Sequence, residues 1–150
     1  MFEQMVFHVE HSLGHTLHFQ SVLESENMKL TIHLSGQVRG GKNNTIVTRT
    51  GHRFPRPEWA KWRDAMVLSV RSQLPVGHVP ICRPCAVSVV YVPEDRRRRD
   101  VPAVLDSLWH VLERAGVVDD DRWLGAGGLS FTPLDPSREK ACAIVEIEEK

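Results

Sequence analysis

The alternation of apolar and polar residues first becomes regular in Lys29–Leu34, where every second side chain is Leu or Ile. This period is typical of a strand with one buried face. The next segment, Ser35–Pro57, breaks the pattern with four glycines, two prolines and two adjacent asparagines. Such a composition predicts a long loop or an irregular hairpin.

Two later segments have the period of a helix. Pro57 suits a first helical position and Glu58 a first turn, and apolar residues then recur every three to four positions to about Leu74. Val101–Ala115 carries a broader apolar stripe, and Gly116 follows it as a typical helix end. We therefore expect two helices, each with one face against the core.

Three further segments are strand-like. Ala86–Val92 is mostly apolar and rich in valine, as in a central strand, whereas Leu129–Thr132 and Ala143–Ile147 are shorter. Pro93–Asp100 forms a charged turn, and Pro133–Ser137 separates the last two strands. The order strand, basic loop, helix, strand, helix, strand, strand predicts an α/β (more strictly α+β) protein, with a mixed sheet flanked by two helices.

Length and charge refine this prediction. A chain of 150 residues with 41% hydrophobic and 25% charged residues suits one main globular core. Residues 1–27 contain four Glu and no Lys or Arg, so residues 28–150 hold four more basic than acidic side chains. Residues 1–27 also lack periodicity, and we expect them to be a mobile extension of a domain at 28–150. With no long apolar run and no secretory signal in view, a cytoplasmic protein without a membrane span is expected.

The cysteines and N-terminal histidines allow a metal-binding interpretation. Cys82-Arg-Pro-Cys85 is a lone CxxC, whereas a zinc site needs a second pair of ligands. Four histidines at spacings of three, four and three would share one face of a helix: His8, His11, His15 and His18. A small zinc- or partner-binding domain is one alternative, and unligated, partly buried thiols are the simpler one.

Arginines dominate two other segments. The loop Ser35–Pro57 carries Arg39, Lys42, Arg49 and Arg53 without an acidic residue, and Arg96–Arg99 is an uninterrupted run. Guanidinium groups on one surface suit phosphate binding. A short charged run is also commonly just solvated. Phosphate binding is favoured over simple solvation by the position of the run, because the run is followed directly by Asp100 at the start of a predicted helix.

Acidic residues lie on both sides of that helix in the sequence. Asp100 precedes it and Asp119–Asp121 follow it. A metal-dependent nuclease requires carboxylates that hold Mg²⁺ and, around them, basic side chains that hold the phosphate backbone. Taken residue by residue, the structural explanations are favoured: a helix N-cap for Asp100 and an exposed acidic turn for Asp119–Asp121. The joint pattern of acids, arginine run and spacing favours the nuclease instead.

These pieces together resemble the signature of RusA-type Holliday junction resolvases. The spacing between the two acidic blocks is that of the family. The segments that carry the resemblance are Asp95–Asp100, Glu113–Gly116 and Val117–Asp121, with weaker similarity in Leu34–Asn44, Trp59–Arg63 and Val145–Ile147. The resemblance covers about residues 28–150 and implies a RusA-like fold.

The resemblance implies a homodimeric, Mg²⁺-dependent endonuclease that nicks paired strands of branched DNA in recombination and repair. Asp100 falls on the first catalytic aspartate and Asp121 on the last, with Asp120 beside it, and these three are the expected metal ligands. Pro102 replaces the family's second aspartate, and Asp106 replaces a helix lysine. We expect Asp106 to act as an outer-shell partner of the ion.

The resemblance also completes the set of expected DNA contacts. Lys42 is the best match to the substrate loop of the family, and Asn43 lies next to it. The full set is Arg39, Lys42, Asn43, Arg49, Arg53, Arg96, Arg97, Arg98 and Arg99. Because Pro102 and Asp106 depart from the family pattern, a catalytically lapsed protein that only binds junctions is the first alternative function.

Overall fold

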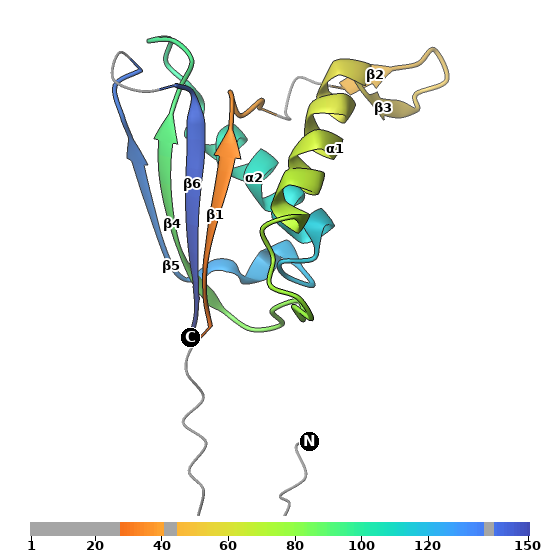
Figure 1. Cartoon of the computed structure of the whole chain (residues 1–150). Coiled ribbons are helices and arrows are strands. Elements are labelled where there is room, and N and C mark those ends of the chain that lie inside the picture. The colour runs from red at the N-terminus through yellow and green to blue at the C-terminus, as the bar shows by residue number, and fades with distance from the viewer. Residues whose placement is uncertain (1–27, 41–44, 137–139) are drawn as a thin grey trace, which may run out of the picture.

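The computed structural model describes residues 28–40, 45–136 and 140–150. Within them, a mixed sheet is covered on one face by two helices, and a small hairpin extends beside the first helix (Figure 1). The α+β class with a mixed sheet and two flanking helices is therefore confirmed. The expected mobile extension at 1–27 lies outside the described residues, as do Lys42 and Asn43.

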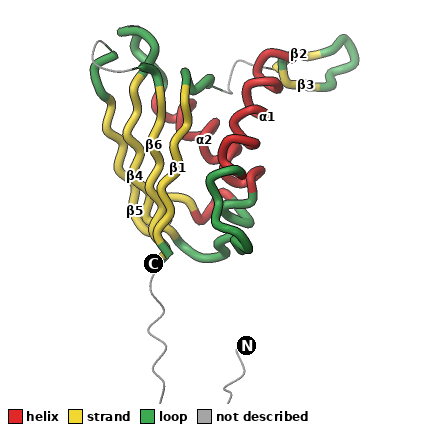
Figure 2. The backbone as a smooth tube through the Cα atoms, in the orientation of Figure 1, coloured by secondary structure: helices red, strands yellow, loops and turns green. Residues whose placement is uncertain are grey.

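Four strands form the main sheet, in the order β1-β6-β4-β5 (Figure 2). The antiparallel neighbours of β6 are β1 and β4, and β5 pairs parallel with β4. The strands are β1 (Lys29–Ser35), β4 (Cys85–Val92), β5 (Leu124–Pro133) and β6 (Cys142–Glu149). Because β1 and β4 are both antiparallel to β6, they run in the same direction and end at the same side of the sheet.

The two helices follow the predicted ranges closely. Helix α2 (Val101–Ala115) ends at Gly116, whose φ of 83° gives the left-handed cap that favours glycine. Helix α1 (Pro57–Arg71) ends three residues before the predicted Leu74. Ser72 and Gln73 form a turn, and Pro75 excludes Leu74 from the helix, because a residue that precedes proline avoids the helical region.

A two-stranded sheet lies inside the predicted loop. Strands β2 (Thr45–Val47) and β3 (Arg53–Pro55) are antiparallel, with Ile46 opposite Phe54. The hairpin alternative for this segment is thus confirmed. The hairpin leads directly into α1 and extends away from the main sheet (Figure 1).

The core lies between the sheet and the helices. Alternate residues of β1, β4 and β6 are buried against α2, whose Leu108, Val111 and Leu112 are fully enclosed. Strand β5 begins earlier than the predicted Leu129 and follows a one-turn 3₁₀ helix, η1 (Asp121–Trp123). Its early part contains a bulge, since Cys85 pairs with Leu124 but Ala86 with Gly128.

The bulge depends on a glycine. A Cβ on Gly127 would lie 2.8 Å from Lys150 Cγ and 3.0 Å from Ala86 N. The glycines that permit this bulge also interrupt the alternation of apolar and polar residues. The sequence pattern therefore predicts only the later part of β5.

The two outer edges of the sheet differ. At β1, the His33 amide donates to Gln73 Oε1 at 2.8 Å, and Gln73 Nε2 donates to the His33 carbonyl at 2.8 Å. The side chain of Gln73 thus takes the place that a neighbouring strand would occupy. At β5, no strand of the described residues pairs with the outer edge.

Candidate nucleic-acid interface

One end of the molecule collects the predicted basic segments. It contains the ends of β1 and β4, the starts of α1 and α2, and the β2–β3 hairpin (Figure 1). We call this region the basic end; its residues are Arg39, Arg49, Arg53, Arg56, Arg96, Arg97, Arg98 and Arg99. Two basic stretches that are distant in sequence, residues 39–56 and 96–99, therefore lie toward the same end of the molecule.

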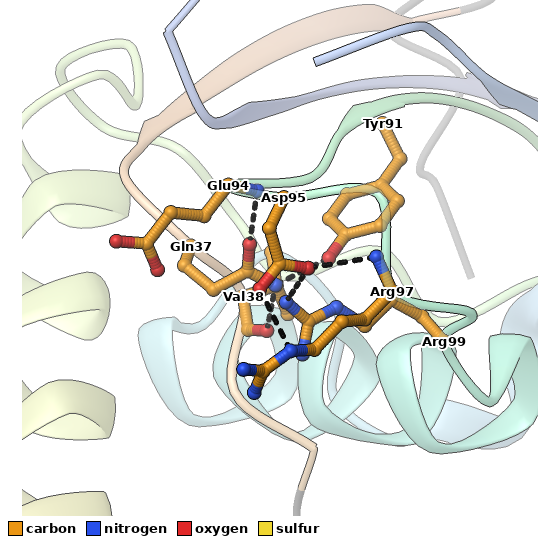
Figure 3. Close-up of polar contacts among 7 residues, drawn as sticks. All are labelled: Gln37, Val38, Tyr91, Glu94, Asp95, Arg97 and Arg99. Atoms are coloured by element: carbon orange, nitrogen blue, oxygen red, sulfur yellow. Dashed lines mark hydrogen bonds and ion pairs between the residues drawn. The ribbon is translucent and has the colours of Figure 1, made fainter.

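Gln37 joins two of these segments (Figure 3). Its Nε2 donates to the hydroxyl of Tyr91 and, at 2.9 Å, to the Val38 carbonyl. The Glu94 amide donates to Gln37 Oε1 at 2.6 Å. The segment that carries Arg39 is thereby fixed to the loop between β4 and α2.

Burial dominates the environment of the Tyr91 hydroxyl. Loss of solvent raises the pKa of Tyr91, and the hydrogen bond from Gln37 acts against that rise. The phenol is therefore a neutral structural group that accepts from Gln37 at ordinary pH.

Close backbone packing brings the Arg39 segment to α2. A Cβ on Gly40 would lie 3.4 Å from Ala103 Cβ in the first turn of that helix. Arg39 is exposed next to this contact, and Asp100 is exposed at the N-cap position. The basic end thus includes the helix start where the resemblance places the first catalytic aspartate.

The arginine run is partly neutralised by acids (Figure 3). Asp95 Oδ1 accepts from Arg99 Nη2 at 2.7 Å and from the Arg97 amide at 2.9 Å. Arg97 Nε also lies 3.6 Å from Asp95 Oδ2, and Arg96 lies 3.8 Å from Asp135. Arg98 has no ion pair with any described residue, so it is the member of the run most available to a phosphate.

The acids near the start of α2 are solvent-exposed. Asp100 is the N-cap residue, but its side chain makes no capping hydrogen bond, so capping does not explain it. Pro102 and Asp106 are exposed on the first turns of the same helix. These three positions lie together at the basic end.

The second acidic block lies at the opposite end of the sheet. The Asp119 amide donates to the carbonyl of Ile81, which lies before the first residue of β4. Asp100 lies beyond the last residue of β4, so the two acids are at opposite ends of that strand. Asp119 Oδ1 accepts from Trp123 Nε1 at 2.7 Å, and Asp120 Oδ1 accepts from the Arg122 amide at 2.9 Å. Asp119 and Asp120 therefore stabilise η1, while Asp121 is exposed in it.

The predicted magnesium ligands are consequently not assembled within one chain. The 15 residues of α2 separate Asp100 from Asp120 and Asp121 by about 22 Å along the helix. In residues 28–40, 45–136 and 140–150, no three His, Cys, Asp or Glu side chains are grouped so that they could hold a metal ion. The residues present in a single chain do not fit the expected Mg²⁺ site, with or without Asp106.

The cysteines are free thiols in different environments. Cys82 is exposed, Cys85 is buried and Cys142 is intermediate. Burial raises the pKa of the Cys85 thiol, and the nearby Glu149 carboxylate adds to the rise. Cys85 is thus an unreactive part of the core, and the described residues give the zinc-binding alternative no ligand cluster. The N-terminal histidines lie outside those residues.

Sequence reasoning assigned no bridging or ion-pairing role to Gln37, Asp95 or Tyr91. Gln37 and Tyr91 are 54 positions apart, and no local pattern marks either as a bridge. Asp95 could have been suspected, because an acid four residues before Arg99 in a compact turn is a natural ion-pair partner.

The architecture defines an α+β protein with arginines gathered at one end of a mixed sheet. Among curated proteins, the chain is similar to the crossover junction endodeoxyribonuclease RusA of Aquifex aeolicus (strain VF5). The two are 28% identical over 97 residues, which cover 65% of this chain and 75% of that protein. No protein-family model matches the chain. No helix in the described part of the chain has the length and apolar character of a membrane span.

Proposed function

We propose that this protein binds branched DNA through the basic end. The observation that carries the proposal is that the arginines of residues 39–56 and 96–99, which are distant in sequence, lie toward one end of the molecule. The similarity to a crossover junction endodeoxyribonuclease supports branched DNA as the substrate class. Guanidinium groups pair with phosphate oxygens in a forked geometry, which makes arginine well suited to a nucleic-acid backbone.

Each basic segment has a distinct part in the proposed interface. Arg98 and Arg39 lie beside the start of α2, and Arg49 and Arg53 lie on the hairpin. Arg99 instead holds the loop through Asp95 and orients its neighbours. Lys42 and Asn43 stay predicted contacts from the sequence.

We propose Mg²⁺-dependent nicking by a homodimer as the second candidate function. The activity in the relative's name favours it, as does the exposed Asp100 beside the arginine run. One chain alone does not bring Asp100, Asp120 and Asp121 together, so cleavage would need a different ligand set or ligands from more than one chain. A catalytically lapsed protein that binds without cleaving requires no such set.

The decisive experiment incubates the protein with a synthetic four-way junction, with and without Mg²⁺. Binding is measured by fluorescence anisotropy, nicking on a denaturing gel, and a linear duplex of equal length serves as the control. We expect tighter binding to the junction than to the duplex, with or without the metal. No binding at micromolar protein would overturn the proposal.

An aspartate variant separates the two candidate functions. If the protein nicks, Asp100→Asn should abolish nicking and leave junction binding unchanged or tighter, because it removes negative charge near the phosphates. If the Asp100→Asn variant nicks as well as wild type, Asp100 takes no part in cleavage. Junction binding without nicking in any divalent metal would favour the lapsed alternative.

A further inference from the structure

The β2–β3 hairpin exposes apolar side chains at a place where a soluble domain usually carries polar ones. Ile46 is 47%, Val47 60% and Phe54 54% exposed. The two strands form a sheet of their own, separate from the main sheet. A two-stranded hairpin gains little stability in isolation, so these side chains are not explained by a core of their own.

The two faces of the hairpin carry different chemistry. Ile46 and Phe54 are directly opposite in the register, so they lie on one face as an apolar pair. Arg53 is opposite Val47 and lies on the other face. One face therefore presents the apolar pair, and the other presents Arg53 next to the exposed Val47.

The turn of the hairpin is well defined. The Thr48 amide donates to the His52 carbonyl at 2.8 Å, and the His52 amide donates to Thr48 Oγ1 at 3.1 Å. Gly51 has a φ of 83°, which glycine adopts without strain, and its amide donates to the Thr48 carbonyl at 2.9 Å. These hydrogen bonds give the turn a defined shape. Arg49 lies at its tip.

The charge of the hairpin selects its partner. No Asp or Glu occurs from Met28 to Pro57, whereas Arg49, Arg53 and Arg56 lie on or beside the hairpin. A second copy of the hairpin would repel it, because both carry the same sign of charge. A partner that combines negative charge with flat apolar surfaces satisfies both features, and nucleic acid has both: phosphates and the faces of its bases.

We propose that the hairpin inserts Phe54 and Ile46 against base faces exposed at the branch point of the DNA, while its arginines hold the flanking phosphates. This inference rests on the proposed function. A linear duplex buries its base faces by stacking, but a branch point interrupts the stack. The hairpin therefore supplies preference for branched over linear DNA, beyond the affinity that the arginines give to both.

The test uses a four-way junction with 2-aminopurine at the branch point and a linear duplex of the same length. We expect wild-type protein to change the 2-aminopurine fluorescence on binding. Phe54→Ala should weaken junction binding about tenfold, as the loss of one stacked base implies, and leave duplex binding unchanged. Phe54→Trp should keep both the fluorescence change and the junction preference that Phe54→Ala loses.

A matched control comes from the other end of the molecule. Val79 is 73% exposed in the loop between α1 and β4, and Figure 1 shows this loop at the end of the molecule opposite the hairpin. Val79→Ala should alter neither binding nor fluorescence. Circular dichroism of Phe54→Ala checks that the fold is kept.

Several outcomes would overturn the inference while leaving the proposed function intact. Phe54→Ala could bind the junction as wild type does, or lose equal affinity for junction and duplex. Sedimentation could instead show that Phe54→Ala dissociates a dimer, which would identify the occupant of the hairpin as a second copy. If wild-type protein binds neither DNA, the proposed function itself fails.

Discussion

Arg99 and Asp95 form an ion pair of 2.7 Å inside the loop that joins β4 to α2. The Asp95 carboxylate also accepts the Arg97 amide at 2.9 Å, so one acid holds the backbone and a guanidinium of the arginine run together. The run is therefore an ordered turn in which the arginines have unequal roles, rather than a row of equivalent charges.

The first prediction follows from this carboxylate. Asp95→Asn should lower the free energy of unfolding by about 1 kcal/mol, because it weakens a charge-assisted hydrogen bond that solvent partly screens. Urea unfolding at neutral pH measures the change. The control is Asp64→Asn on α1, because among the described residues Asp64 forms an ion pair with the adjacent Arg63 alone. Equal stability of the two variants would show that Asp95 does not order the loop.

The second prediction distinguishes the arginines by salt dependence. The logarithm of the DNA binding constant should fall linearly with the logarithm of salt concentration, by about 0.9 for each phosphate contact. Arg98→Ala should reduce that slope by about one contact. Arg122→Ala, in which Arg122 stacks 4.4 Å from the Trp123 ring at the opposite end, should leave it unchanged. If the slope changes in Arg122→Ala but not in Arg98→Ala, the DNA binds at the end opposite the basic end, and the prediction is wrong.

The third prediction concerns the two departures from the family pattern. Pro102 and Asp106 are both exposed and one helical turn apart, so substitutions there should not disturb the core. Pro102→Asp combined with Asp106→Lys restores the residue types that the resemblance implies. If wild type binds junctions without nicking, this double variant should gain Mg²⁺-dependent nicking, measured on a denaturing gel. Pro102→Ala with Asp106→Ala is the control, and nicking by neither variant would show that other features disabled the site.

The sequence predicted the fold better than the site. Periodicity located β1, β4 and both helices, because each buries a regular set of apolar positions against the other layer. The acidic blocks were expected to meet, since they are close in sequence and match a family signature. Yet the helix between them carries the chain from one end of the sheet to the other, a separation that sequence spacing does not reveal.

Other parts of the site depend on contacts between distant residues. The bridge from Gln37 to Tyr91 arises only when β1 and β4 end at the same side of the sheet. The exposed hairpin is different, because Ile46 and Phe54 stand out as apolar residues within a polar, glycine-rich loop. That signal was present in the sequence, but it does not say whether such residues are buried or exposed.

The fourth prediction is a loss of stability in alkali. Burial raises the pKa values of Cys85 and Tyr91. The unfolded chain therefore releases these protons at a lower pH than the folded chain, and the free energy of unfolding should fall as the pH rises above about 8.5. Urea unfolding between neutral and strongly alkaline pH measures the fall. Cys85→Ala should make the early part of the decline shallower, and an unchanged profile would contradict the role of that thiol.

The fifth prediction concerns thiol reactivity. Cys82 is exposed and should react with a thiol reagent in the native protein, whereas the buried Cys85 should react only after unfolding. Single-cysteine variants that keep one of the two thiols allow the rates to be compared in native buffer and in denaturant. Rapid native reaction of Cys85 would mean that the core opens near the start of β4.

The side chain of Gln73 protects one point on the outer edge of β1 from pairing with another strand. The backbone amide and carbonyl of His33 are both bonded to Gln73, whereas the outer edge of β5 pairs with no strand of the described residues. A strand from a second molecule would therefore have to displace Gln73 before it could extend the sheet across His33, and such protection of an edge disfavours edge-to-edge aggregation. Gln73→Ala removes this protection, and light scattering should then detect more association than in the wild-type protein.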